Sequence, residues 1–261
     1  MSHADSPMSY TELPPRPELA PWVAALWSFA VAPEAGVIEH VIPPTGGVSV
    51  SVGRGGEAML AGPRTQPFAM PVAGGDAWWG FHLWPGAAPS LLGLPAGSLR
   101  EAVGPARLWL DPAWCERLTA ALTGGPPEAA AAERLDAALG ELVPTAGPLD
   151  AAVMTVVLRI VRSRGSESVE ELARGADLSP RHLRRRFRAA VGLTPKELAR
   201  VRRLRATAAD AVLAARPWVD VAAAGGYADQ AHLVREFREL LGVTPRRFEH
   251  HARRIAHRLV E

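Results

Sequence analysis

The sequence predicts an α+β protein, with a mostly β N-terminal domain over residues 1–145 and an all-α C-terminal domain over 146–261 that carries two helix-turn-helix units. Three observations lead to this fold class. In the first part, Gly and Pro separate short alternating or aromatic runs, as in sheets with tight turns. In the second part, apolar residues recur at helical spacing. Finally, the phrase FRAAVGLTP at 187–195 returns as FRELLGVTP at 237–245, fifty residues later.

The first elements of the N-terminal domain follow from local pattern. Residues 1–20 are rich in proline and are expected to be extended, and residues 21–32 are expected to form a short helix that leads into a strand. Residues 47–52 (GVSVSV) alternate apolar and polar side chains, which predicts a half-buried strand. The aromatic run at 76–84 (DAWWGFHLW) predicts another strand, which ends at Pro85.

Two helices are expected before the domain boundary. Asp111 precedes Pro112, a combination typical of an N-cap followed by proline at the first helical position, and the helix should continue to about Leu122. GGPP at 124–127 breaks it, and the Ala-rich residues 128–142 predict the second helix. The prolines at 144 and 148 then mark the boundary.

From Leu149 onward the sequence predicts only helices. Apolar residues at 149–161 form one stripe with a period of 3.6 residues, and Gly165 ends this helix. Ser168 and Glu171 form a capping-box pattern that starts the next one.

The match extends backwards from the repeated phrase, because residues 168–187 and 218–237 also align without gaps. Each copy predicts a short helix, a glycine turn and a second helix, for which Ser179 and Asp229 are suitable N-caps. Apolar residues four apart place one buried face on each second helix: Leu183 with Phe187, and Leu233 with Phe237. This is a helix-turn-helix written twice, a motif that places its second helix in the major groove of DNA.

The exposed faces of the two second helices are expected to contact DNA. On the first helix, four arginines at i, i+3, i+4 and i+7 share one face: Arg181, Arg184, Arg185 and Arg188. Arginine can pair with guanine or with phosphate. The second helix offers a different set, namely Gln230, Ala231, His232 and Arg235, so the two helices should read different sequences. The alternative is a helical protein-binding domain with a solvated arginine face, and two copies in register favour DNA over it.

A long helix is expected between the two units. Gly192 ends the first reading helix, and Thr194 to Glu197 form a second capping-box pattern with Pro195 at the first helical position. The helix should continue to about Ala215. A helix of about 20 residues is roughly 30 Å long, which suits reading helices in successive major grooves roughly 34 Å apart.

With these phrases in place, the sequence resembles the AraC/XylS family of bacterial transcription regulators. The resemblance covers about the last 100 residues and includes GYADQAHLVREF at 226–237 and GVTP at 242–245. It implies seven helices and base contacts by Arg181, Arg184 and Arg185 in the first unit. In the second unit it implies contacts by Gln230, Ala231 and Arg235. The sequence departs from the family at Ala231, where serine is frequent, and at Leu233, where phenylalanine is frequent.

The N-terminal half resembles a less characterised sensor domain that occurs in some members of that family. HVIPPTGG at 40–47, AGPRTQP at 61–67 and GFHLWPGAA at 80–88 carry this resemblance. It implies a mostly β regulatory domain and no particular ligand. We therefore expect a sequence-specific DNA-binding transcriptional regulator, such as an activator, controlled by a small-molecule effector at the N-terminal domain.

Composition restricts the expected cellular location and the expected class of binding partner. Residues 1–165 hold 10 basic and 15 acidic residues, whereas residues 166–261 hold 19 basic and 12 acidic ones, so only the second half should meet a polyanion. No apolar stretch is long enough to span a membrane, no signal peptide is evident, and Cys115 is the only cysteine. We expect a cytoplasmic, nucleoid-associated protein. Its expected partners are double-stranded DNA, a small-molecule effector, RNA polymerase and a second copy of itself, and no membrane is expected among them.

An effector pocket is expected around the aromatic strand, lined by His40, Trp78, His82 and Trp84. In a strand, residues 78, 80, 82 and 84 share one face, and 79, 81 and 83 share the other, structural face. Two histidines without a third ligand do not predict a metal site, and no cofactor is expected.

Two alternatives stay open. One is a thiol- or histidine-based reactive or redox sensor, or an enzyme-like domain tethered to DNA, with chemistry at Cys115 or His82. The other is a ligand-independent regulator whose N-terminal half only dimerises or recruits polymerase. No enzymatic activity is expected, because no hydrolase triad, Walker loop or dinucleotide fingerprint is present.

Overall fold

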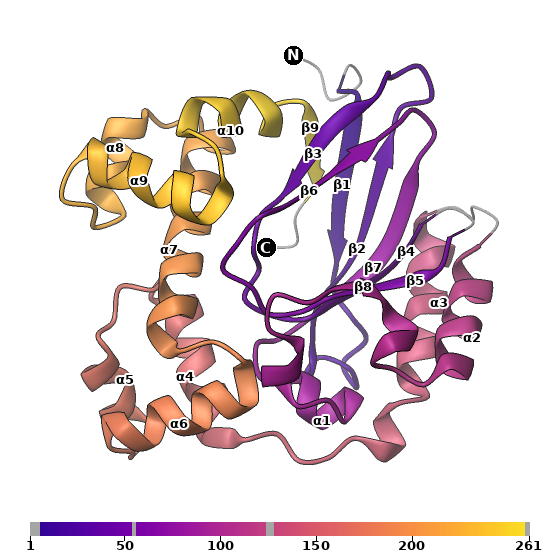
Figure 1. Ribbon diagram of the computed structural model, residues 1–261, viewed down its shortest axis with the longest axis horizontal. Coiled ribbons are helices and arrows are strands. Elements are labelled where there is room, and N and C mark those ends of the chain that lie inside the picture. The colour runs from indigo at the N-terminus through magenta and orange to yellow at the C-terminus, as the bar shows by residue number, and fades with distance from the viewer. Residues whose placement is uncertain (1–5, 54–55, 124–127, 259–261) are drawn as a thin grey trace.

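The computed structural model describes residues 6–53, 56–123 and 128–258, so the break expected at 124–127 lies outside the described residues. Figure 1 shows a β-rich part, built mainly by the first half of the chain, and a helical part that lies beside one side of the sheets. Helix α7 runs along the helical part from one end to the other, facing the sheets.

Two sheets form the β-rich part. The smaller sheet pairs β3 (Ile38–Ile42) with β6 (Phe68–Val72) in antiparallel fashion. Within the described residues the larger sheet has seven strands, in the spatial order β8 (Val103–Pro105), β5 (Ala58–Ala61), β4 (Ser49–Gly53), β7 (Ala77–Leu83), β2 (Val23–Val31), β1 (Met8–Leu13) and β9 (Ile255–Arg258). Its neighbours are antiparallel except β1 and β9, which run parallel.

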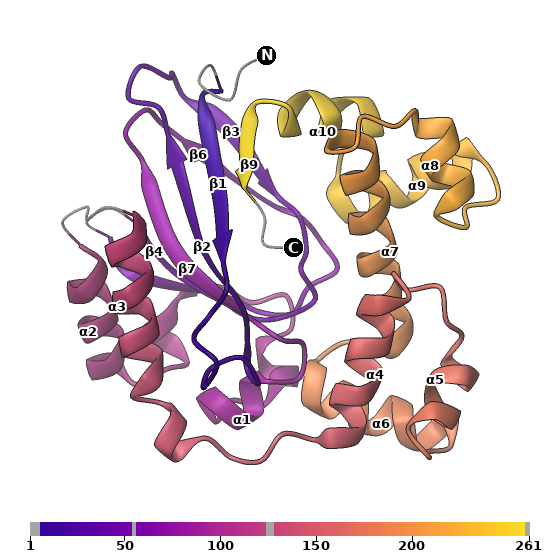
Figure 2. The ribbon, with the colours of Figure 1, turned by 180° about the vertical axis from the view of Figure 1, so that it is seen from behind.

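The larger sheet has a packed face and a face turned toward the helical part. Because side chains alternate along a strand, Trp79, Phe81 and Leu83 of β7 point into the main core, while Trp78 and His82 point the other way. Figure 2 shows α2 and α3 against the packed face. The helices of this part are α1 (Ala88–Leu92), α2 (Pro112–Leu122) and α3 (Glu128–Gly140), with short 3-10 turns η2 (Ala96–Leu99), η3 (Ala106–Leu108) and η4 (Val143–Thr145).

Helix α2 begins as expected. The Asp111 carboxylate accepts a hydrogen bond from the Trp114 backbone N–H at 2.7 Å, and Pro112 occupies the first turn. The Trp114 indole packs edge-on against Phe81 and donates to the Ala138 carbonyl of α3. The helix pair is thereby fixed to the sheet.

The helical part contains seven helices within the described residues, the number that the family resemblance implies: α4 (Ala151–Arg162), α5 (Val169–Gly175), α6 (Pro180–Val191), α7 (Pro195–Val212), α8 (Trp218–Ala224), α9 (Gln230–Leu241) and α10 (Pro245–Ala252). They enclose two small cores, one around Phe187 and one around Phe237. Helix α7 contributes Leu198 to the first core and Leu204 to the second, so it joins the two helix-turn-helix units through buried contacts.

The structure corrects three expectations. Residues 21–22 belong to a turn, and residues 23–31 are entirely strand, because they pair with β1 on one side and β7 on the other. The region after Leu149 is not only helical, because β9 pairs with the open edge of β1. Helix α7 ends at Val212, short of Ala215.

Candidate nucleic-acid interface and the cavity beside it

Local signals position the first reading helix, α6. The Ser179 hydroxyl accepts a hydrogen bond from the His182 backbone N–H, Pro180 occupies the first turn, and Gly192 ends the helix in the left-handed conformation at φ 79°. Leu183 and Phe187 are fully buried. The opposite side of the helix is therefore turned outward.

The outward side of α6 is basic. Arg181, Arg184, Arg185 and Arg188 are all exposed. Arg184 lies 3.7 Å from Glu170 in a solvent-exposed pair, and for the other three no ion pair is found within the described part of the chain. Arg186 differs, because its guanidinium is held by both oxygens of Asp150 at 2.7 and 3.1 Å. Four cations of α6 are thus presented to solvent and a fifth is engaged in structure.

The second reading helix, α9, has the same scaffold and a different surface. Its N-cap Asp229 accepts from the His232 backbone N–H at 2.6 Å, and Gly242 ends the helix in the left-handed conformation. Gln230, Ala231 and Arg235 are exposed. His232 is half-buried, with its ring edge-on to Tyr227, so its side chain supports the turn between the helices.

The arginines at the start of α7 mostly serve its packing. Arg200 binds Glu236 of α9 through two hydrogen bonds at 2.6 and 3.2 Å, and these contacts raise the pKa of its guanidinium. Arg203 donates to the Gly165 carbonyl at 2.7 Å. Helix α7 is therefore tied by charge-assisted bonds to α9 and to the loop between α4 and α5.

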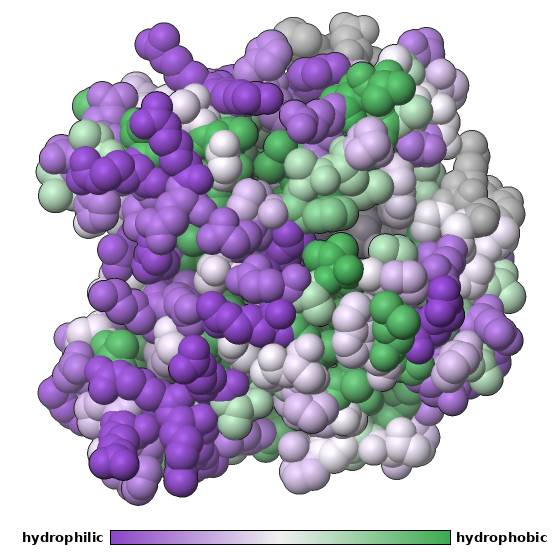
Figure 3. All heavy atoms as spheres, in the orientation of Figure 1, coloured by the Kyte–Doolittle hydropathy of each residue, from purple (hydrophilic) through white to green (hydrophobic). Residues whose placement is uncertain are grey.

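Figure 3 shows that hydrophilic residues predominate on the visible surface of the helical part, while more of the pale and hydrophobic residues lie over the sheets. No described helix is both long and apolar enough to cross a membrane.

A cavity of about 410 Å³ lies between the sheets and the helical part. The sheets contribute Trp27, Phe29, His40, Trp78 and His82, among others. Helix α7 contributes Val201, Leu204, Arg205, Ala208, Ala209 and Val212, and α10 contributes Phe248 and His251. Most of the lining is apolar, so the cavity suits a largely apolar molecule.

Three of the four residues expected at an effector pocket line this cavity: His40, Trp78 and His82. Trp84 does not line it. The Trp84 indole instead donates to the Ala20 carbonyl at 3.1 Å and packs against the main core.

A polar cluster in the cavity wall was not expected from sequence. Tyr10 donates its hydroxyl proton to Glu12 at 2.8 Å and lies 3.2 Å from the His82 Nε2, which places the donor proton of the ring on that nitrogen. Burial, together with nearby Arg205 and Arg202, lowers the pKa of His82 to about 3, so the ring is neutral at pH 7.

Arg205 could have been found in the sequence. It lies among Val201, Ala208 and Val212 on one helical face, where a cation is unexpected.

The single thiol lies away from the cavity. Cys115 is buried in the main core on α2, and burial, followed by the charge of Asp111, raises its pKa. A raised pKa disfavours the thiolate that reactive cysteines use. Among the residues that the structure describes, no group of three His, Cys, Asp or Glu side chains could hold a metal ion.

Comparison with known proteins identifies both parts of the chain. Residues 172–251 match a family described as a helix-turn-helix domain, and residues 11–105 match a domain of unknown function, DUF6597. No curated protein matches the chain in sequence.

Several solved structures are similar. A transcriptional regulator from Chromobacterium violaceum with an AraC-type DNA-binding domain is 21% identical over 40% of this chain and 91% of its own, with a TM-score of 0.37. The C-terminal domain of AraT, a response regulator from Geobacillus stearothermophilus, is 20% identical over 44% of this chain and 92% of its own, also at 0.37. ToxT from Vibrio cholerae is 8% identical over 94% and 97%, at 0.45. The assignment rests on the family matches rather than on these likenesses.

Two helix-turn-helix units in series, each presenting an exposed polar helix, define the class: this is a DNA-binding transcriptional regulator. Within that class its helix-turn-helix domain is of the AraC type, and it is joined to an N-terminal domain of unknown function.

Proposed function

We propose that α6 and α9 read two unlike half-sites on one face of a DNA duplex, and that a small molecule bound between the sheets and α7 controls this reading. The observation that carries the proposal is the pairing of two reading helices that have matching buried residues with different exposed faces. Leu183 and Phe187 match Leu233 and Phe237 in burial, while the outward residues differ.

The proposed contacts of α6 are its four exposed arginines, Arg181, Arg184, Arg185 and Arg188. Arginine pairs bidentately with guanine O6 and N7 and also with phosphate, so some of the four would read bases and others would anchor the backbone. On α9 the proposed contacts are Gln230 to adenine, Ala231 to a thymine methyl and Arg235 to guanine or phosphate. His232 contributes by holding the turn, since its ring packs on Tyr227.

The control site is proposed from the position of the cavity. Helix α7 forms one wall of the cavity and also carries buried contacts to both helix-turn-helix cores. A molecule that binds there touches the element that fixes the distance between the two reading helices. Its differential affinity for two arrangements of α7 would shift DNA binding by the same free energy.

Self-association and contact with RNA polymerase remain predictions from the sequence. Sedimentation of the full chain with and without duplex measures the first, and transcription from a recovered site with purified polymerase measures the second. The thiol-sensor alternative is disfavoured by the burial of Cys115 and its raised pKa.

Selection of bound duplexes from a random pool by the full chain tests the function. We expect recovered sites with two different short patterns whose centres are about one helical turn, ~10 bp, apart. Binding should weaken steeply with salt, because arginine–phosphate contacts release counterions. Recovery of no enriched sequence at low salt would contradict sequence-specific regulation.

A further inference from the structure

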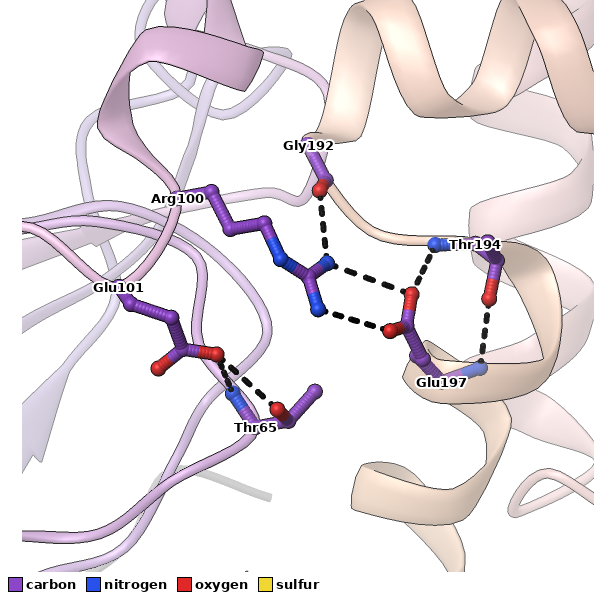
Figure 4. Close-up of polar contacts among 6 residues, drawn as sticks. All are labelled: Thr65, Arg100, Glu101, Gly192, Thr194 and Glu197. Atoms are coloured by element: carbon purple, nitrogen blue, oxygen red, sulfur yellow. Dashed lines mark hydrogen bonds and ion pairs between the residues drawn. The ribbon is translucent and has the colours of Figure 1, made fainter.

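One arginine of the N-terminal part reaches across to the first helix-turn-helix unit. Arg100, directly after η2, donates to both carboxylate oxygens of Glu197 at 2.8 and 3.4 Å and to the Gly192 carbonyl at 3.1 Å (Figure 4). The side chains of Arg100 and Glu197 are 31% and 26% exposed, so the pair is mostly shielded from solvent. We call these three bonds the Arg100 clasp.

The clasp joins the end of one helix to the start of the next. Gly192 is the left-handed residue that ends reading helix α6, and Glu197 is the capping-box glutamate of α7. The same carboxylate accepts from the Thr194 backbone N–H at 2.7 Å. Burial alone would raise the pKa of Glu197, but hydrogen bonds from Arg100 and Thr194 outweigh it and lower the pKa to about 2. The carboxylate is therefore charged at every physiological pH.

The loop that carries Arg100 is held in a strained conformation. Glu101 has φ 56°, a left-handed value that is uncommon for residues other than glycine. Its backbone N–H donates to the Pro63 carbonyl, and its carboxylate accepts from the backbone N–H and hydroxyl of Thr65 at 2.8 and 3.0 Å. Strain that is locked by surrounding bonds in this way is often kept for function. Here these bonds hold Glu101, the residue that follows Arg100, in place.

The two surfaces around the clasp fit closely. A Cβ atom on Gly192 would lie 2.6 Å from the Ala96 carbonyl oxygen and 2.9 Å from Pro63 Cγ. The end of α6 is thus seated directly on η2, with no room for a side chain.

Seating at this end leaves the reading face open. The clasp holds the C-terminal end of α6, whereas Arg181, Arg184 and Arg185 lie in its first half and are exposed. We propose that Arg100 is a positioning residue for DNA recognition: through the clasp, the N-terminal part holds α6 at a fixed angle to α9, so that both half-sites are met together. This proposal rests on the proposed reading of two half-sites.

The physical reason is preorganisation. Two helix-turn-helix units that can rotate independently lose orientational freedom when both bind one duplex, and this loss of entropy weakens binding. A charge-assisted bond that fixes one unit before binding removes part of this entropic cost. The gain in affinity appears only when both units bind the same duplex.

The test compares the full chain with Arg100→Ala on the duplex recovered by selection. We expect the variant to bind the two-half-site duplex about 10-fold more weakly, which is the order expected for a lost charge-assisted interaction. The slope of log affinity against log salt should stay unchanged, because Arg100 neutralises no phosphate. On duplexes that keep only the first or only the second half-site, the variant and the wild type should bind equally.

Two further variants keep the test decisive if Arg100→Ala is unstable. Arg100→Lys retains the charge but not the planar fork, so an intermediate loss is expected. Arg117→Ala removes an ion pair with Glu141 that lies wholly within the N-terminal part and should bind like the wild type. Equal binding by all variants on the two-half-site duplex would overturn the proposal. An equal loss on single half-sites would also overturn it, and absence of binding by the wild type would instead contradict the proposed function.

Discussion

At the residue scale, neighbouring arginines of α6 have different environments and therefore different expected roles. Arg185 is exposed on the reading face, whereas the guanidinium of Arg186 is bound by the Asp150 carboxylate that also caps α4. A guanidinium that is already paired with a structural carboxylate is less available to bind a phosphate or a base than one that faces solvent. The adjacent pair therefore provides a matched comparison.

We expect Arg185→Ala to weaken binding to a selected duplex by ~1–3 kcal/mol and to relax base preference at one position. Arg186→Ala, the matched control, should change affinity by less than about 0.5 kcal/mol, because surface ion pairs contribute little. Fluorescence anisotropy with cognate and substituted duplexes measures both. An equal loss for Arg185→Ala on every sequence would make this residue a phosphate anchor rather than a base reader.

The buried His82 predicts a pH dependence of stability. Its pKa in the folded protein is about 3, below the ordinary value near 6.5, so between these pH values the unfolded chain binds more protons. Stability should therefore fall as pH drops from about 6.5 toward 3, by up to about 1.4 kcal/mol per pH unit from this group. His82→Gln should flatten this slope in urea unfolding at pH 7, 6 and 5. An unchanged slope would show that the buried ring does not cause it.

At the element scale, the two helix-turn-helix units are held by separate cores joined through α7. Phe187 and Phe237 are each fully buried at the centre of one core, and each lies four residues after a buried leucine. The glycine and threonine-proline that follow each Phe end the reading helix and start the next one. The repeated phrase is thus scaffold, which explains why it is repeated while the reading faces differ.

Truncating either phenylalanine should destabilise one unit. We expect Phe187→Ala and Phe237→Ala each to lower the free energy of unfolding by ~3–5 kcal/mol, because a buried aromatic side chain leaves a cavity. The exposed Arg188→Ala should change it by less than about 0.5 kcal/mol. Denaturant titration followed by circular dichroism measures the difference. Losses below 1 kcal/mol for both Phe variants would contradict the two-core description.

Much of the helical part could be predicted from sequence because its signals are local. The caps at Ser168, Ser179, Thr194 and Asp229 act within three residues, and the buried pairs lie four residues apart. The sheet was harder to predict. The apolar run at 21–32 suits a helix or a strand equally by pattern, and only pairing with β1 and β7 decides between them.

Contacts between segments that are far apart in the sequence could not be predicted, because local sequence patterns do not indicate them. Strand β9 exists because β1 offers an edge, and nothing in residues 255–258 alone indicates it. The cavity combines His82 with Arg205, and the clasp combines Arg100 with Glu197, which are far apart in sequence. Such partners become neighbours only through tertiary structure.

At the scale of the whole molecule, the cavity connects the two parts of the chain. Its walls come from both sheets, from α7 and from α10, and two of its lining residues, His40 and His251, are in contact across the two parts at 3.1 Å. A ligand there would be enclosed by both parts at once. A ligand that bound one arrangement of the two parts more tightly than another would therefore favour that arrangement.

A large side chain introduced into the cavity should exclude a bound small molecule. We expect the full chain to bind the apolar fluorescent probe 1-anilinonaphthalene-8-sulfonate saturably, and Ala209→Trp, on the α7 wall, to lose most of this binding. Ala214→Trp, at an exposed position beyond the end of α7, should bind the probe like the wild type. Equal probe binding by Ala209→Trp would show that the probe binds elsewhere. DNA affinity measured on the same variants reports whether the cavity controls reading.

The pairing of β1 with β9 has a consequence for how the protein is made. Met8 lies opposite Ile255 in the parallel ladder, so a strand made early is completed by one made roughly 250 residues later. At a synthesis rate of about 5–20 residues per second, the outer edge of β1 stays unpaired for on the order of ten seconds or more while the chain is made. An open edge strand is prone to pair with other chains. During synthesis this edge can therefore pair with another chain until β9 has been made, and a chaperone that covers β1 would protect it.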